Sequence, residues 1–213
     1  MKILFEDGGI IVCVKPCGLL SQSDSGGADN MVTCLENLIG GDIYPLHRLD
    51  REVGGVMVFA KTKPAAAALS RDIAERRFKK EYLAMVHGAP DAESGVFRDL
   101  LFKDSRRNKV YTVSRMRKGV REAELCYSVI ETKGEYSLIS IILKTGRTHQ
   151  IRVQFASRGM PLAGDRRYGA RDDFKNIGLW SHRLEFINPV TKIRQEFECL
   201  PENFMREYFN INM

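Results

Sequence analysis

The 213-residue sequence predicts an α+β fold in which a mixed, largely antiparallel sheet is flanked by helices. Strand-like runs outnumber helical ones, and the first two flank the tight turn Asp7-Gly8-Gly9, which is typical of antiparallel neighbours. A chain of this length can bury one good core. No internal repeat, low-complexity tract or long linker interrupts it, so we expect residues 1–213 to form a single domain.

In the first half of the chain, the expected elements are strands near 3–6, 9–15 and 53–60 and a short helix near 31–39. The stretch 21–30 between them is expected to be one flexible loop, because turn-forming residues dominate it. Thr62 and Pro64 then start a helix over 65–77, in which Ala68, Leu69 and Ile73 form a buried stripe. This spacing is typical of a packing helix and not of a cofactor site.

The second half is expected to be richer in strands. A helix over 148–158 ends at Gly159, and a terminal helix starts at Pro201. The expected strands lie near 79–87, 110–116, 121–131, 135–144, 179–187 and 192–198.

The composition is typical of a soluble protein that binds polyanions, with 44% hydrophobic residues, a net charge of +6 and a pI of about 9.1. Eight Lys or Arg residues and the single acid Asp104 lie between Lys103 and Arg121. Basic runs most often only keep a surface solvated. Here Tyr111, Val113 and Met116 are interleaved with the charges, which predicts a protruding ribbon that contacts the backbone of a polyanion.

The N-terminus reaches an acid and two glycines after only three apolar residues, too soon for a signal peptide or a membrane span. The five cysteines form no CxxC pair and no zinc-finger spacing with histidine, so we expect reduced, mostly buried thiols without a metal site or a disulfide framework. These features predict a cytoplasmic protein with no membrane partner.

Residues 47–60 place one carboxylate, Asp50, between Arg48 and Arg51, directly before an apolar strand. Flanking cations favour the ionised form of a carboxylate, and a short turn before a buried strand fixes its position. Charge and fixed position are what a nucleophile requires. The plain alternative is that Asp50 only forms an ion pair with one of these arginines on a surface loop.

A second motif occupies residues 146–152, Gly-Arg-Thr-His-Gln-Ile-Arg, at the start of a segment with helical spacing. Both motifs join a strand edge to arginine and histidine, a combination suited to RNA or phosphate. Together with residues 80–88 and 162–169, they resemble the RluA family of pseudouridine synthases. Four motifs in the same order are far more specific than one.

The resemblance implies a pseudouridine synthase catalytic fold, with the sheet and helices around a central RNA-binding cleft. It implies an isomerase that converts specific uridines of structured ribosomal or transfer RNA, with no metal or other cofactor. It covers nearly the whole chain and leaves no room for the N-terminal S4 RNA-binding module of many relatives. We expect a monomer, because no heptad or long exposed apolar stripe demands a partner.

The resemblance also assigns the site residues. Asp50 would be the catalytic group, attacking the sugar C1′ or the base C6 or abstracting a ribose proton, and these routes stay open. Arg147 would pair with Asp50 and restrict its rotamers, and Tyr82 would pack against the target base. Arg48 would support a nucleotide flipped out of the RNA helix, and Ile151 would form an apolar wall for the uracil. Without the resemblance, Tyr82 is best explained as a core residue and Arg48 as part of a surface ion pair.

The histidines are not expected to act as general bases. His47 and His149 belong to the matched motifs, but a histidine in such a position more often makes a structural hydrogen bond. His87 and His182 are interpreted as ordinary structural or surface residues. The turn 165–169 is expected along the cleft.

Two positions depart from the family pattern. Val53-Gly54 replaces the usual Thr-Ser after the catalytic turn, and Trp180-Ser181-His182 replaces the usual Leu-His-Ala. The loss of two hydroxyls near Asp50 removes candidates for a hydrogen bond that positions the turn, while consecutive glycines allow backbone geometry that serine restricts. Substrate preference is the property that we expect these departures to affect.

Two other functions fit part of the pattern. One is a non-catalytic RNA-binding or RNA-folding protein on the same scaffold, with the basic ribbon as its working surface; the intact set of Asp50, Tyr82 and Arg147 argues against it. The other is a nucleosidase-like hydrolase, which is disfavoured because no second carboxylate is suitably placed. The reaction product distinguishes all three.

Overall fold

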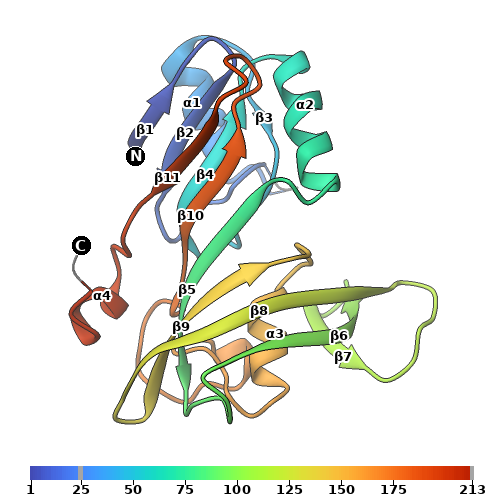
Figure 1. The fold of residues 1–213 in the computed structure, drawn as a ribbon, viewed down its shortest axis with the longest axis vertical. Coiled ribbons are helices and arrows are strands. Elements are labelled where there is room, and N and C mark those ends of the chain that lie inside the picture. Colours follow the sequence, from blue (N-terminus) through green and yellow to red (C-terminus); the bar gives the residue numbers. More distant parts are fainter. Residues whose placement is uncertain (24–25, 212–213) are drawn as a thin grey trace. The chain divides into compact units, whose positions relative to one another are not determined.

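A computed structural model describes residues 1–23 and 26–211 of the chain, so the expected loop over 21–30 falls partly outside the described residues. The chain divides into two compact units, coloured along the sequence in Figure 1. Unit 1 comprises Met1–Lys80 and Trp180–Pro201, and unit 2 comprises Glu81–Leu179 and Glu202–Met213. Strands dominate both units and nearly all strand pairs are antiparallel, which confirms the predicted α+β class.

Unit 1 is built on strands in the order β1-β2-β4-β10, with β3 paired to β4 and β11 paired to β10. Every residue of β2 and β4 is buried, because both are apolar runs apart from Lys15 at the end of β2. The β4–β10 pair is parallel, and the other strand pairs described in this unit are antiparallel. The strands are β1 (Lys2–Glu6), β2 (Ile10–Lys15), β3 (Tyr44–Pro45), β4 (Gly54–Ala60), β10 (Leu179–Ile187) and β11 (Arg194–Glu198).

Two helices belong to unit 1. The Asn30 side chain accepts a hydrogen bond at the start of α1 (Met31–Ile39), and Gly40 ends this helix in the left-handed conformation. The Thr62 side chain caps α2 (Lys63–Ala74), which packs against β3 and β4 (Figure 1). Helix α2 ends before the predicted limit of residue 77, because the backbone turns left-handed at Arg76.

Unit 2 has strands in the order β5-β9-β8-β6-β7, all antiparallel. Helix α3 (Gln150–Ala156) packs against β6 and β7 (Figure 1), and the short helices η1 (Arg166–Tyr168) and α4 (Phe204–Tyr208) follow. The strands are β5 (Lys79–His87), β6 (Ser94–Asp104), β7 (Lys109–Val113), β8 (Val120–Lys133) and β9 (Tyr136–Leu143).

Strand β6 is an element that the sequence did not predict. Only Phe97 and Leu101 are buried along its length, and the polar Asp99 lies between them on the same face, so the apolar alternation typical of a strand is broken. Its polar side chains find partners across the sheet instead, as in the pair between Arg98 Nε and Glu124 Oε2 at 3.0 Å.

All five cysteines are free thiols. The expectation that most are buried was wrong, because only Cys13 and Cys199 are buried, whereas Cys34 is exposed. Among the described residues, no helix combines the length and the apolar character needed to cross a bilayer.

Candidate active site

Asp50 lies in a tight turn directly before β4, a strand of unit 1 in which every residue is buried. The turn is closed by a hydrogen bond of 3.0 Å from Val53 N to the Asp50 carbonyl. Leu49 before it and Val53 after it are 6% and 2% exposed, whereas Asp50 itself is half-buried. A carboxylate with buried apolar residues on both sides is thus presented at the rim of a rigid strand.

His47 has a structural role in the same turn, as expected. Its Nε2 accepts a hydrogen bond of 3.3 Å from Val58 N of β4, so the ring proton is on Nδ1, which is buried without a partner. Burial, with a smaller contribution from the Lys80 charge, lowers the pKa of His47 to about 3. The ring is therefore neutral near pH 7, and it anchors the turn to the strand.

Lys15, the last residue of β2, is a residue of this site that the sequence analysis did not single out. Its side chain is completely buried, and Nζ donates to the carbonyls of Pro16, Leu19 and Arg51 at 2.9, 2.6 and 3.1 Å. Burial lowers the pKa of Lys15 to about 8, although nearby negative charges, including that of Asp50, oppose this shift. Lys15 ends a strand that is otherwise entirely apolar, and a buried lysine must find hydrogen-bond acceptors. This position is the feature of the sequence that could have indicated its role.

The two departures from the family pattern face each other across the β4–β10 pair. Gly54 pairs with Trp180 and Gly55 with Ser181. A Cβ at Gly54 would lie 2.4 Å from the Trp180 ring, and one at Gly55 would lie 2.2 Å from the Ser181 carbonyl oxygen. Trp180 is 1% exposed and donates from its indole nitrogen to the Cys199 carbonyl at 2.9 Å. Gly54 thus leaves the space that this tryptophan fills.

The two arginines beside Asp50 differ in their contacts. Arg48 is exposed. Arg51 is also exposed, but its Nε donates to the Gly18 carbonyl at 2.9 Å and its own carbonyl accepts from Gly18 N at 2.8 Å. Arg51 is therefore tied to the loop after β2.

In unit 2, Tyr82 and Ile151 are both buried. Tyr82 lies on β5 opposite Ile141 of β9 and is 5% exposed. Ile151 is 4% exposed on α3, where its neighbour Val153 joins a core cluster with Leu101, Val110 and Ala123. Both side chains thus belong to the apolar interior of their unit, which for Tyr82 agrees with the interpretation as a core residue.

Arg147 is exposed and lies in a turn that is held by its neighbour Gln150. The Gln150 side chain is 3% exposed and accepts from Arg147 N at 3.0 Å and from the Thr145 hydroxyl at 2.8 Å. Its amide nitrogen donates to the Glu124 carbonyl at 3.1 Å. The Arg147 guanidinium in turn donates from Nε to the Glu122 carbonyl at 2.9 Å, which leaves its terminal nitrogens toward solvent.

The other polar residues of the second motif build the fold of unit 2. Arg152 and Asp165 form a buried, two-point ion pair at 2.6 and 2.9 Å, with side chains 6% and 1% exposed. His149 Nδ1 lies 3.0 Å from the Tyr168 hydroxyl, which accepts from Val110 N at 2.9 Å. His149 therefore makes the expected structural hydrogen bond, and the 165–169 turn is fixed through Asp165 and Tyr168.

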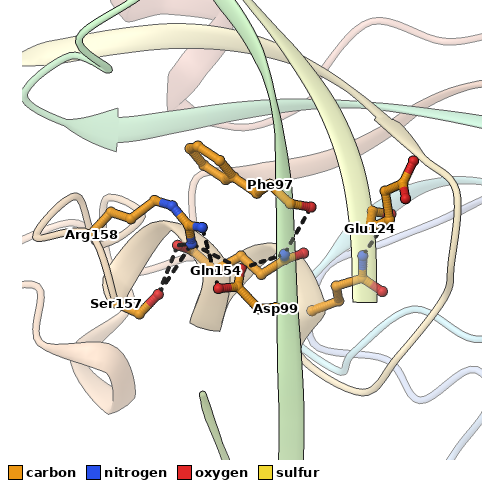
Figure 2. Close-up of polar contacts among 7 residues, drawn as sticks. Phe97, Asp99, Glu124, Gln154, Ser157 and Arg158 are labelled. Atoms are coloured by element: carbon orange, nitrogen blue, oxygen red, sulfur yellow. Dashed lines mark hydrogen bonds and ion pairs between the residues drawn. The ribbon is translucent and has the colours of Figure 1, made fainter. Parts of the chain in front are cut away.

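A polar cluster on α3 fastens that helix to β6 (Figure 2). The amide nitrogen of the fully buried Gln154 donates to the Phe97 carbonyl at 3.3 Å and to Asp99 Oδ2 at 2.7 Å. The Arg158 guanidinium binds the same carboxylate at 2.9 Å and stacks 3.9 Å from the Phe97 ring centroid. The second motif is thus carried on a helix with little freedom to move.

The basic segment 103–121 lies on the β6–β7 hairpin and the loop that leads into β8. Asp104 Oδ1 closes the hairpin turn by accepting from Arg106 N and Arg107 N at 3.0 and 3.2 Å. Lys109 is half-buried over the rings of Tyr111 and Tyr168. The exposed cations of this ribbon are Lys103, Arg106, Arg107, Arg115, Arg117, Lys118 and Arg121.

The predicted site residues therefore fall in both units: Arg48 and Asp50 in unit 1, and Tyr82, Arg147 and Ile151 in unit 2. A family model described as RNA pseudouridylate synthase matches residues 9–157, which contain all five. The chain belongs to this family. The match confirms the resemblance to RluA-type synthases that the motifs indicated.

Relatives with this family name are similar over most of the chain. A ribosomal large subunit pseudouridine synthase C of Buchnera aphidicola is 34% identical over 88% of this chain and 63% of its own length. A ribosomal large subunit pseudouridine synthase D of Zymomonas mobilis is 32% identical over 100% of this chain and 73% of its own length. An uncharacterised RNA pseudouridine synthase of Aquifex aeolicus is 38% identical over 98% of this chain and 72% of its own length. The chain thus spans about two thirds of the length of these relatives.

Solved structures share the fold. Human RNA pseudouridylate synthase domain containing 4 superposes with a TM-score of 0.80 at 22% identity, covering 100% of this chain and 94% of that chain. Human RNA pseudouridylate synthase domain containing 1 gives a TM-score of 0.80 at 23% identity, covering 97% and 85%.

Proposed function

We propose that this protein is an RNA pseudouridine synthase that isomerises a uridine in structured RNA, with Asp50 as the catalytic carboxylate. The observation that carries the proposal is the Asp50 turn, which lies inside the matched family region and presents a half-buried carboxylate at the rim of β4. Such a group can act without a cofactor, because both proposed roles, nucleophile and base, need only a fixed, ionised oxygen.

The reaction sets the demands on the rest of the site. The N1–C1′ bond is broken, and the uracil is kept captive and rotated. A new bond then joins C5 to C1′, C5 loses its proton to solvent, and N1 takes up a proton. Asp50 would attack C1′ or C6, or abstract a ribose proton, and each route requires a nearby surface that holds the detached base. We assign this holding role to the Tyr82 ring and the Ile151 side chain, and substrate binding to Arg147.

Access to a stacked uridine requires base flipping, since the duplex hides the glycosidic bond. Arg48 is exposed next to the Asp50 turn, so it is available to take the space of a flipped nucleotide. We propose that the basic ribbon binds the RNA backbone in addition, because its exposed cations lie on one hairpin and its connecting loop.

The names of two relatives point to ribosomal RNA, and we propose structured RNA of that kind, in the cytoplasm, as the substrate. RNA shape is read as much as sequence in such complexes.

The salt dependence of RNA binding tests the role of the ribbon. Replacing one phosphate-binding cation with glutamine should lower the slope of log K against log salt by about 1. Arg106→Gln and Lys118→Gln are suitable variants, because neither side chain has a structural role in the described contacts.

The test is product analysis with unmodified RNA that carries tritium at uridine C5. Release of tritium with pseudouridine in the digested strand supports the proposal. Released uracil would instead identify a hydrolase. Tight, salt-sensitive binding with no change in any cellular RNA would identify a non-catalytic RNA-binding protein.

A further inference from the structure

The residues on both sides of Asp50 are held through their backbone by one short segment, residues 15–21. On the N-terminal side, the Ser21 hydroxyl accepts from Leu49 N at 2.9 Å and donates to the Leu49 carbonyl at 2.8 Å. Both bonds are buried, and Ser21 is 3% exposed. A single hydroxyl therefore satisfies both backbone groups of the residue before the carboxylate.

On the C-terminal side, the Arg51 carbonyl accepts from Lys15 Nζ at 3.1 Å and from Gly18 N at 2.8 Å. The two other bonds of Lys15, to the carbonyls of Pro16 and Leu19, fold the segment around the ammonium group. Residues 49 and 51 are thus fixed to the same support, which leaves the Asp50 backbone little freedom between them.

No side chain of the turn itself carries a hydroxyl group that could replace that of Ser21. Val53 and Gly54 follow it, and both are buried without a polar side chain. The contacts to Ser21 and Lys15 reach across 28 and 36 residues of sequence, so they belong to the tertiary structure and not to the local turn.

We propose that Ser21, supported by Lys15, is a positioning residue for Asp50: it holds the catalytic turn in the geometry that the reaction needs and does not touch the RNA. The inference rests on the proposed synthase function. Misplacement of a reacting group by about 1 Å can cost on the order of 100-fold in rate. Loss of the Ser21 hydroxyl should therefore slow the chemical step while leaving RNA binding in place.

Ser21 is a better probe than Lys15, because removal of the buried ammonium group would take a donor from three carbonyls at once and disturb the whole 15–21 segment. The variants are Ser21→Ala, Ser21→Val and Ser21→Thr in the full chain. Valine and threonine have the same shape and share any cost of an added methyl group, but only threonine keeps a hydroxyl. Ser137→Ala is the matched control, since Ser137 is also fully buried and donates to the Gly88 carbonyl at 2.7 Å in unit 2.

The measurements are the single-turnover rate of pseudouridine formation, the Kd for RNA, and hydrogen exchange of the amides in residues 48–53. For Ser21→Ala and Ser21→Val we expect a rate lower by about 10- to 100-fold, a Kd within about threefold of wild type, and faster exchange of the Leu49 amide. Ser21→Thr should recover most of the rate, and Ser137→Ala should keep it.

Wild-type rates in Ser21→Ala and Ser21→Val would overturn the inference, as would an equal loss of rate in Ser137→Ala, which would show a general effect of reduced stability. Failure of the wild-type protein to form pseudouridine is a separate result. It would overturn the proposed function, and the inference with it.

Discussion

The turn around Asp50 and the motif at 146–152 both contain arginine and histidine. They differ in where the polar side chains that hold them in place come from. In unit 1 the turn is held from outside, by Ser21, Lys15 and the strand contact of His47, and its carboxylate lies half-buried at the rim. In unit 2 the motif uses most of its own polar side chains for support, in the ion pair of Arg152 and the hydrogen bonds of Gln150.

This difference separates residues that build a site from residues that are available to a substrate. Arg147 and Arg152 are five positions apart in one motif, yet one is exposed and the other is buried on Asp165. A motif identified from sequence therefore contains both kinds, and burial distinguishes them. The predictions below test that distinction in order of expected effect.

The largest effect on stability is expected where the second motif is structural. Asp165→Asn leaves the Arg152 guanidinium buried without its counter-charge, which should lower the free energy of unfolding by about 3–5 kcal/mol. Urea denaturation at pH 7 measures this loss. The neighbouring Arg166→Gln is the control, because its side chain is exposed and the change should stay within about 0.5 kcal/mol. Equal, small losses in both variants would show that the buried ion pair contributes no more than a surface charge.

A smaller effect is expected beside the first motif, where Gly54 faces Trp180. Gly54→Ser should cost about 1–3 kcal/mol, because its Cβ would overlap the indole ring. Trp180→Leu alone should also destabilise, since it loses buried ring area and the bond to the Cys199 carbonyl. The double variant should be more stable than the sum predicts by about 1 kcal/mol. If the losses of unfolding free energy in the two single variants sum to the loss in the double variant, the two positions do not compensate each other.

The third effect is specific to acid. The pKa of His47 is about 3 in the folded protein and near its ordinary value of 6.5 in the unfolded chain. The unfolded chain therefore binds one more proton between these values, and stability is lost as the pH falls from 6.5 toward 3, by up to about 1.4 kcal/mol per pH unit. His47→Gln keeps an acceptor for Val58 N but cannot titrate. The plot of unfolding free energy against pH should be flatter for His47→Gln than for wild type by this amount. Parallel plots for the two proteins would rule out a neutral His47 ring in the folded protein.

Much of the fold followed from the sequence because its strongest elements are local. Strands β2 and β4 are continuous apolar runs, and α2 begins with a capping threonine and a proline. Strand β6 was missed because its polar residues find their partners in distant parts of unit 2, Arg98 on β8 and Asp99 on and just after α3. The matched motifs located Asp50, but not its support from Ser21 and Lys15, because those contacts join side chains to distant backbone atoms. The lysine at the end of β2 indicated a need for acceptors but not which carbonyls supply them.

The role of the Asp50 carboxylate in the chemistry can be measured by single-turnover conversion of uridine to pseudouridine in wild type, Asp50→Asn and Asp50→Ala. We expect a rate at least about 1,000-fold lower in both variants, with the Kd for RNA within about threefold of wild type. Conversion by either variant within about tenfold of the wild-type rate would contradict this role and assign the chemistry to another residue.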